Sequence, residues 1–335
     1  MKAVVVERPN EVAYRDVDAP AVGAGDVLVH SRQAGLCRTD IEMITGDFTD
    51  PRWVRFPLIP GHEWAGTVVE VGAGVVDVRP GDRVVCEGMI PCHRCARCRS
   101  GATHWCENIE ALGFTRPGGY AELVAVPQRV VHRLPEHVSF DAGVLVEPAS
   151  VVLHALEKAC PQPGEAVGVI GVGTLGALAV ALLRLHSPCR IAAFGVREEE
   201  LELARRLGAT EAVLSGDATH AELDLIVETA GAPAAVELAT RLCRPGGRAV
   251  LLGIAGEGRT LTLPSDLLVG SEITLFGSLA YPSAVWSRVV RLVTDRVLDL
   301  DPIVTHRFPF SEFREAMRLM DDRRGIVAKV VLEHA

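Results

Sequence analysis

The pattern of apolar positions along the chain changes at about residue 150. Before that point, short Val-rich runs such as 27–30, 66–71, 82–86 and 122–126 are separated by Gly and Pro residues. Short apolar runs bounded by turn residues are typical of the strands in a β-barrel or β-sandwich. The pattern therefore predicts a β-rich domain before about residue 150.

From about residue 151 to 280, apolar runs of strand length alternate with longer stretches of helical character. The run 166–170 precedes a helix-like stretch at 175–185, and the run 190–194 precedes another at 198–207. This alternation is typical of a parallel sheet covered by helices. The sequence thus predicts an α/β chain whose second part is a doubly wound parallel sheet.

Length and charge narrow the class of protein. A chain of 335 residues has the length of two ordinary domains, and its 48% hydrophobic residues suffice for two cores. The formal net charge of −9 repels phosphate groups, so neither nucleic acid nor a membrane is an expected partner. The apolar start is broken at Glu7, Arg8 and Pro9, and no later run approaches the ~20 apolar residues of a membrane span. We therefore expect a soluble, cytoplasmic protein.

A glycine-rich turn lies between the first strand and the first helix predicted for the α/β part. Its residues are Gly171, Gly173, Thr174, Leu175 and Gly176, in the pattern GxGxxG. Glycines let the backbone turn tightly, so that the pyrophosphate of a dinucleotide reaches the N–H groups at a helix N-terminus. The context predicts a dinucleotide site.

The end of the second predicted strand bears on the choice of cofactor. NAD-binding chains carry an acidic residue there, about 20 positions after the glycines, which binds the ribose 2′-hydroxyl. Here Gly195 takes that place and Arg197 follows, so a 2′-phosphate would meet a guanidinium group instead of a carboxylate. This pattern favours NADP(H) over NAD(H). The alternative is that Arg197 merely begins a charged helix, since Glu198, Glu199 and Glu200 follow it.

Four cysteines are spaced as the ligands of one metal ion. They are Cys92, Cys95, Cys98 and Cys106, in the pattern C-x2-C-x2-C-x7-C. Two-residue gaps bring neighbouring thiolates to one tetrahedral ion, and a site with four cysteine ligands has no open position. The spacing therefore predicts a structural zinc site.

A second set of metal-ligand residue types is dispersed along the chain. It comprises Cys37, His62, Glu63 and Glu147. Spacing alone leaves two interpretations open. The residues form a catalytic metal site, or they serve separately as a buried thiol, a satisfied histidine and a helix-start carboxylate.

Five motifs in a fixed order carry a family resemblance. They are GxCxTD at 35–40, GHExxG at 61–66, the four cysteines, the pair Glu147-Pro148 and the GxGxxG turn. In this combination the chain resembles the zinc-containing medium-chain dehydrogenases over essentially its whole length. The segments 302–309, 112–115 and 119–122 are similar to the polyol (sorbitol), threonine and aminocyclitol dehydrogenase branch.

The resemblance implies the organisation of the chain. Residues 1–150 and 284–335 would form a GroES-like catalytic domain with a structural zinc lobe at about 86–110, and residues 151–283 would form a Rossmann domain. The segment 272–277 would be the outer Rossmann strand, which this family pairs across a two-fold axis. A homodimer or homotetramer is therefore expected.

The resemblance also assigns the dispersed residues. Cys37, His62 and Glu147 would face a catalytic zinc. Glu63 would be an exchangeable ligand or a partner of the zinc-bound water, and Asp40 would orient His62. With the four-cysteine site, the chain would hold two zinc ions.

The implied chemistry is oxidation of an alcohol or reduction of a ketone. A zinc with an open position binds the alcohol oxygen and lowers its pKa. The proton would leave through the Thr39 hydroxyl, while hydride passes between the carbinol carbon and the nicotinamide. Thr39 has the alternative or additional role of a helix cap. Arg38 would contact the pyrophosphate, as the arginine does in alcohol dehydrogenases that carry CRTD.

One departure from the family bears on the substrate. Sorbitol dehydrogenases carry an arginine that contacts the polyol where this chain has Ala280, so sorbitol itself is in doubt. The candidate pocket residues are Phe48, Trp53, Phe114, Arg116 and Tyr281. We expect a polyhydroxylated or amino-bearing secondary alcohol, or its ketone, such as an aminocyclitol or amino-sugar intermediate of antibiotic synthesis.

Three other functions remain as alternatives. The first is NAD-dependent oxidation of a polyol or amino alcohol. The second is a non-catalytic NADPH-binding protein derived from the family, although Cys37, Thr39 and His62 are all retained. The third is a zinc-free reductase of the same fold, a class that lacks the four cysteines.

Overall fold

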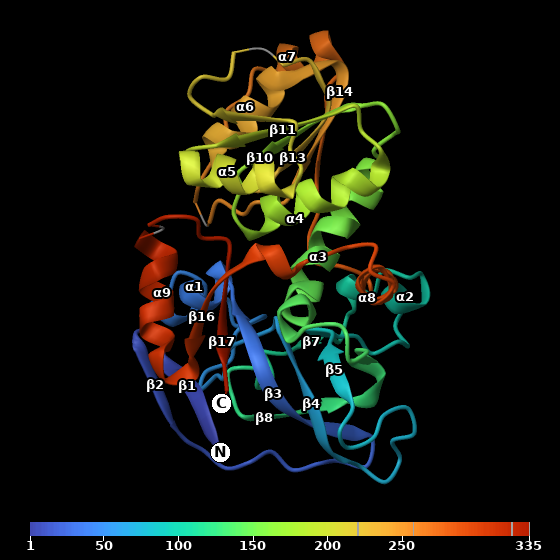
Figure 1. Ribbon diagram of the computed structural model, residues 1–335, viewed down its shortest axis with the longest axis vertical. Helices are drawn as coiled ribbons and strands as arrows, with labels where there is room; N and C mark the ends of the chain where they lie inside the picture. Colours follow the sequence, from blue (N-terminus) through green and yellow to red (C-terminus); the bar gives the residue numbers. More distant parts are fainter. Residues whose placement is uncertain (220, 257, 323, 335) are drawn as a thin grey trace. The chain divides into compact units, whose positions relative to one another are not determined.

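The computed structural model describes residues 1–219, 221–256, 258–322 and 324–334, which divide into two compact units (Figure 1). The first unit comprises residues 1–147, 281–322 and 329–334, and the second comprises residues 148–280 and 324–328. Helix α3 (Phe140–Ala159) carries the chain from the first unit into the second. Within the described residues, no helix is both long and apolar enough to cross a membrane.

The first unit is built on a mostly antiparallel sheet in the order β16-β17-β3-β4-β5-β9, with β8 also paired to β3. Its strands are β3 (Asp26–Leu36), β4 (Trp64–Val71), β5 (Arg83–Cys86), β8 (Leu123–Pro127), β9 (Val131–Arg133), β16 (Val304–Pro309) and β17 (Lys329–Glu333). Because β17 pairs with β3, the end of the chain lies beside the segment that leads to Cys37.

Smaller elements surround this sheet. Two short antiparallel pairs are β1 (Lys2–Arg8) with β2 (Glu11–Asp16), and β6 (Met89–Ile90) with β7 (Glu110–Ala111). The α-helices described here are α1 (Arg38–Thr45), α2 (Ala96–Arg99), α8 (Ser283–Thr294) and α9 (Phe313–Asp322). The 3-10 helices in this unit are Thr103–Trp105, Gln128–Val130, Asp301–Ile303 and Phe310–Glu312.

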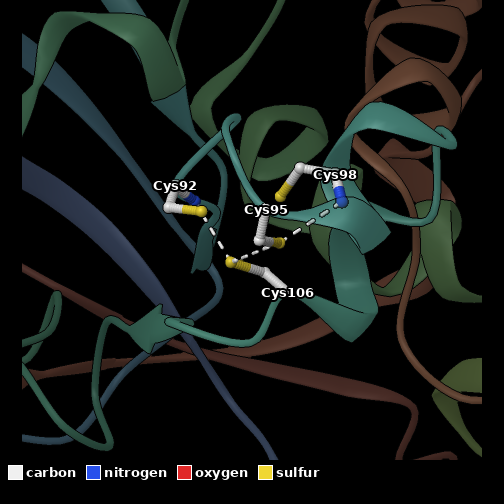
Figure 2. A group of neighbouring side chains, drawn as sticks. All are labelled: Cys92, Cys95, Cys98 and Cys106. Atoms are coloured by element: carbon white, nitrogen blue, oxygen red, sulfur yellow. Dashed lines mark hydrogen bonds between the residues drawn. The ribbon is translucent and has the colours of Figure 1, made fainter.

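The segment between β6 and β7 forms a lobe around the four cysteines. The antiparallel pair of β6 and β7 joins the two ends of the lobe, and helix α2 places Cys98 beside Cys95. Figure 2 shows the four cysteine side chains gathered together, with Cys95 and Cys98 at helix α2. Local chain geometry therefore suffices to bring these side chains together.

The second unit is built on a parallel sheet in the order β12-β11-β10-β13-β14-β15. Its strands are β10 (Ala166–Ile170), β11 (Arg190–Gly195), β12 (Glu211–Leu214), β13 (Leu223–Glu228), β14 (Cys243–Leu251) and β15 (Thr274–Gly277). The helices between them are α4 (Thr174–Leu183), α5 (Glu198–Leu207), α6 (Pro233–Leu242) and α7 (Ser265–Ser271), with a 3-10 turn at Arg184–His186.

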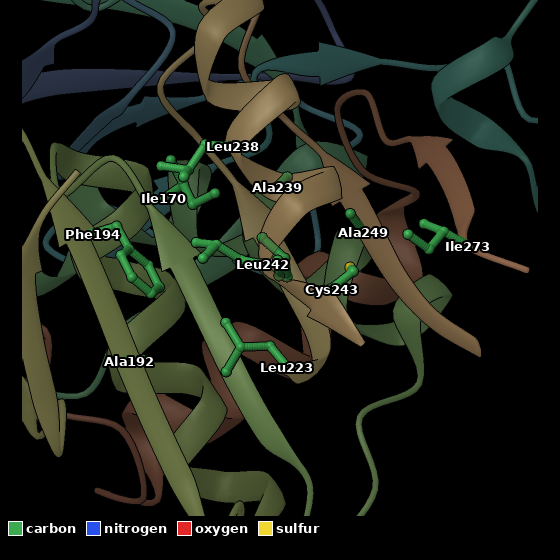
Figure 3. Close-up of a cluster of buried hydrophobic side chains, with 11 residues drawn as sticks. Ile170, Ala192, Phe194, Leu223, Leu238, Ala239, Leu242, Cys243, Ala249 and Ile273 are labelled. Atoms are coloured by element: carbon green, nitrogen blue, oxygen red, sulfur yellow. The ribbon is translucent and has the colours of Figure 1, made fainter. Parts of the chain in front are cut away.

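Helices cover both faces of this sheet. Successive side chains of a strand point to opposite faces. Phe194 of β11 packs in a cluster with Leu238 of α6, whereas its neighbour Ala193 packs with Ala204 of α5. Figure 3 shows the first cluster, in which Leu238, Ala239 and Leu242 of α6 lie over the strands. The predicted α/β fold with a doubly wound parallel sheet is confirmed.

Candidate functional site

Three of the dispersed ligand types converge in the first unit. Cys37 follows the last residue of β3, and His62 and Glu63 precede the first residue of β4. Because these two strands are antiparallel neighbours, with Ala34 opposite Trp64, the end of one lies beside the start of the other. One ligand atom from each of the three side chains lies within 4.8 Å of the others. A thiol, an imidazole and a carboxylate at this spacing are the donor set that fits zinc.

Asp40 joins the segments that carry this cluster. Its buried carboxylate accepts hydrogen bonds from the Cys37 N–H at 3.0 Å and from the Tyr120 hydroxyl at 2.9 Å. Its other oxygen lies 3.5 Å from His62 Nδ1 and accepts the Gly61 N–H at 3.3 Å. Although burial raises the pKa of Asp40, the charge of His62 and these hydrogen bonds lower it below its ordinary value. The carboxylate thus faces the imidazole and links it to the start of α1.

Lys329 was not predicted from the sequence, yet it is part of this cluster. Its side chain is only 2% exposed, and its Nζ pairs with Glu63 Oε2 and donates to the Leu36 carbonyl at 3.2 Å. Gly35 leaves the necessary room, because a Cβ atom there would lie 2.4 Å from Glu63 Oε2 and 3.2 Å from the Lys329 chain. The sequence held one indication of this role, a single lysine inside the apolar strand 328–332. A charged side chain that is buried in this way requires a partner of opposite charge.

Glu147 lies beside the cluster but outside the group of three ligand atoms. It is in the middle of α3, so the interpretation as a helix-start carboxylate is wrong. Burial raises the pKa of Glu147 to about 7, although the charge of His62 and a hydrogen bond with Tyr281 oppose the rise. The carboxylate is thus close enough to interact with the cluster electrostatically.

Tyr281 has a different position from that expected of a pocket residue. It is 1% exposed, and its hydroxyl accepts the Gly88 N–H at 3.1 Å and is hydrogen-bonded to Glu147. A buried hydroxyl with two partners is not available to a substrate. The contacts favour a role in holding Glu147 in place.

Of the remaining candidate pocket residues, Phe114 contacts the cluster directly. Phe114 packs against His62, with ring centroids 5.0 Å apart, and shares an apolar cluster with Phe48 and Trp53. Phe114 and Arg116 also line a cavity of about 310 Å³, and Arg116 lies 3.6 Å from Glu110.

The four cysteines of the lobe form a second group, with one sulfur each within 4.8 Å of the others. Backbone groups hold them: the Cys92 N–H donates to Cys106 Sγ at 3.2 Å, and the Cys98 N–H donates to Cys95 Sγ at 3.4 Å. Hydrogen bonds from the backbone lower the pKa of Cys92 to about 6. Thiols arranged in this way fit a tetrahedral zinc ion without an open position.

The glycine-rich turn in the second unit has the geometry of a dinucleotide site. It lies between β10 and α4, as predicted from the pattern. A Cβ atom on Gly176 would lie 1.8 Å from the Gly171 carbonyl oxygen, so the turn requires glycine there. Gly173 is exposed, and Thr174 and Leu175 are half-buried, at the start of the helix. The N–H groups of this helix end suit an anion.

The residues expected to select the cofactor lie at the end of β11. Gly195 is its last residue, and Arg197 is the N-cap of α5. Arg197 donates from Nε and Nη2 to Glu200 Oε1, both at 3.2 Å. The guanidinium group therefore already has an anionic partner on its own helix.

Arg38 and Thr39 begin α1 in the first unit. Arg38 pairs with Asp321 at 2.6 Å and with Glu42 at 3.7 Å. Thr39 is half-buried and lies two residues after Cys37. The roles predicted for Arg38 at the pyrophosphate and for Thr39 in proton transfer stay predictions.

Known proteins resemble the chain in both parts. Residues 23–136 match the alcohol dehydrogenase GroES-like domain, and residues 174–295 match the zinc-binding dehydrogenase family. An L-threonine 3-dehydrogenase of Streptomyces coelicolor is 33% identical, with 99% of each chain covered. The chain belongs to the zinc-containing medium-chain dehydrogenase family. The resemblance stated from the motifs is confirmed, as is the GroES-like and Rossmann fold class.

Other members of the family place the chain in its polyol and threonine dehydrogenase branch. The galactitol 1-phosphate 5-dehydrogenase of Escherichia coli K12 is 31% identical, with 99% of each chain covered. A protein described as a zinc-binding dehydrogenase from Sinorhizobium meliloti 1021, bound to NADP, superposes with a TM-score of 0.92 at 29% identity over 99% of each chain. An alcohol dehydrogenase of Escherichia coli CFT073 complexed with NADH superposes with a TM-score of 0.90 at 25% identity, with 100% of this chain and 99% of that chain covered. The chain is thus similar to proteins solved with either nicotinamide cofactor.

Proposed function

We propose that the chain is a zinc-dependent oxidoreductase that interconverts a secondary alcohol and its ketone with NADP(H). The observation that carries this proposal is the convergence of Cys37, His62 and Glu63 at the junction of β3 and β4. These residues would hold a catalytic zinc, with Glu147 beside them. The four cysteines of the lobe would hold a second, structural zinc.

Zinc with an open coordination position supplies a Lewis acid for an alcohol or carbonyl oxygen. Side chains of the protein would transfer the proton and hold the zinc ligands in place. Thr39 exchanges the proton of the substrate hydroxyl through its own hydroxyl group. Asp40 holds His62, and Lys329 offsets the charge of Glu63, so that the ligands keep their places.

The cofactor part of the proposal rests on the second unit. The turn from Gly171 to Gly176 would bind the pyrophosphate at the start of α4, and Arg38 would contribute a further contact. Arg197, beside a strand end that lacks its own acid, would bind the 2′-phosphate of NADP(H). One similar dehydrogenase was solved with NADP and another with NADH, so the choice of NADP(H) depends on Gly195 and Arg197.

The substrate class follows from the branch of the family. The related proteins act on L-threonine and on galactitol 1-phosphate, as their names state. We propose a polyhydroxylated or amino-bearing secondary alcohol, including cyclitols and amino sugars, with ketone reduction as the physiological direction. Phe48, Trp53 and Phe114 would form the apolar side of its pocket.

We also propose a homodimer or homotetramer. The edge strand β15 has one neighbour, β14, among the described strands, and its free edge suits pairing with a second copy. The mass in solution by light scattering tests this part independently of activity.

A substrate panel tests the proposed activity. L-threonine, galactitol 1-phosphate, a cyclitol, an amino sugar and the matching ketones are offered with each cofactor, and absorbance of the reduced nicotinamide is followed. The Cys37→Ser variant is the matched control. Turnover by the zinc-loaded protein, lost in the control, supports the proposal. No turnover above the control with any member of the panel would contradict it.

A further inference from the structure

The end of β11 lacks an acidic residue of its own, but a carboxylate from the following helix α5 lies beside it. A side chain at position 195 would start from a Cβ atom 3.1 Å from Glu200 Oε2. Glu200 belongs to the first turn of α5, five positions later in the chain. The acid that NAD-binding chains carry at the strand end is therefore replaced, in part, by a glutamate from the following helix.

Contacts fix this carboxylate beside the strand end. Glu200 is 6% exposed, and its Oε2 accepts the Val196 N–H at 3.1 Å. Its Oε1 accepts both Nε and Nη2 of Arg197. The position in the first helical turn also stabilises a negative charge. Glu200 is thus held against Gly195 and Arg197 together.

Within the described residues of α5, Glu200 is the acid that pairs with Arg197, whose Nη1 also donates to the Gly325 carbonyl at 3.4 Å. Glu198 pairs with Arg205 at 2.7 Å, and Glu202 pairs with Arg206 at 2.9 Å, so these two acids have other cations. A 2′-phosphate at the strand end would be attracted by Arg197 and repelled by the carboxylate paired with it. A 2′-hydroxyl carries no charge and can donate a hydrogen bond to a carboxylate, so Glu200 would not repel it.

We propose that Glu200 is a specificity-determining residue, which limits the preference for NADPH over NADH by offsetting Arg197. This inference rests on the proposed use of a nicotinamide cofactor. The cofactor preference would then depend on two paired charges. Removing Glu200 should increase the preference for NADPH, and removing Arg197 should decrease it.

Titration calorimetry with NADPH and NADH tests the proposal on the zinc-loaded protein. The quantity compared is the ratio of the Kd for NADH to the Kd for NADPH. In Glu200→Gln, which keeps the size of the side chain, we expect this ratio to rise about tenfold, as one charge interaction of ~1.4 kcal/mol would give. In Glu199→Gln, an exposed acid of the same helical turn, it should stay within about twofold of the wild type.

A second variant keeps the test decisive if Glu200→Gln does not fold. In Arg197→Ala the carboxylate faces the 2′-phosphate without its cation, so the ratio should fall below one. An unchanged or lower ratio in Glu200→Gln, or a ratio that stays above one in Arg197→Ala, would overturn the proposal. The wild-type ratio itself reports on the proposed NADP(H) preference, and turnover reports on the proposed activity, so the failures are distinguishable.

Discussion

The two candidate metal sites of the first unit are assembled in different ways. The lobe takes its four cysteines from 15 consecutive positions, 92 to 106, and backbone N–H groups hold the sulfurs. The cluster at Cys37, His62 and Glu63 joins two strand ends. Its ligands contact two buried side chains, Asp40 in the first turn of α1 and Lys329 on the distant strand β17. The first site depends on local chain geometry, whereas the second depends on the folded sheet and on compensated charges.

The largest effect is expected where a ligand of the lobe is removed. Cys95→Ser should lower the zinc content from two ions per chain to one. It should lower the free energy of unfolding by at least about 5 kcal/mol, because structural zinc contributes directly to folding. Metal analysis and thermal unfolding measure both effects. The exposed Cys189 provides the control, since Cys189→Ser should leave both unchanged. Two zinc ions per chain in Cys95→Ser would contradict a zinc site that depends on the four cysteines.

A smaller effect is expected from the buried cation of the second site. Lys329→Met leaves the Glu63 carboxylate buried without its partner, which should destabilise the zinc-free protein by about 3–5 kcal/mol. Zinc should restore part of this loss, because the metal cation then faces the carboxylate. Chemical unfolding with and without zinc measures the difference. The surface pair of Lys2 and Asp16 gives the control, since water screens this pair and Lys2→Met should leave the free energy of unfolding almost unchanged. Equal effects of the two variants would show that Lys329 has no special role.

The smallest effect is expected at Tyr281. Tyr281→Phe removes one hydroxyl that contacts Gly88 and Glu147, so stability should fall by about 1–2 kcal/mol. If Glu147 is held by this hydroxyl, kcat/KM should fall severalfold while the zinc content stays the same. Tyr14→Phe, at a half-buried tyrosine of β2, is the matched control for thermal unfolding and steady-state kinetics. Unchanged kinetics would instead give Tyr281 a purely structural role.

The contrast between the sites explains what the sequence could predict. Spacing was enough for the cysteine lobe, and position between a strand and a helix was enough for the glycine-rich turn. The helix α3 was missed because 140–159 lies where the β-rich pattern was extended to residue 150. Lys329 and Tyr120 were missed because each acts on a residue that only the fold brings beside it. Glu200 was missed because the sequence shows it as one of three charged residues at a helix start, whereas it is buried and paired with Arg197.

The proposed chemistry requires that the cluster at β3 and β4 holds a catalytic zinc distinct from that of the lobe. Zinc content and turnover of the His62→Ala variant, measured on the same preparation, test this claim. We expect one zinc per chain instead of two, and turnover reduced by at least about 10³-fold, in a protein that unfolds cooperatively. A variant that keeps two zinc ions and wild-type turnover would contradict it.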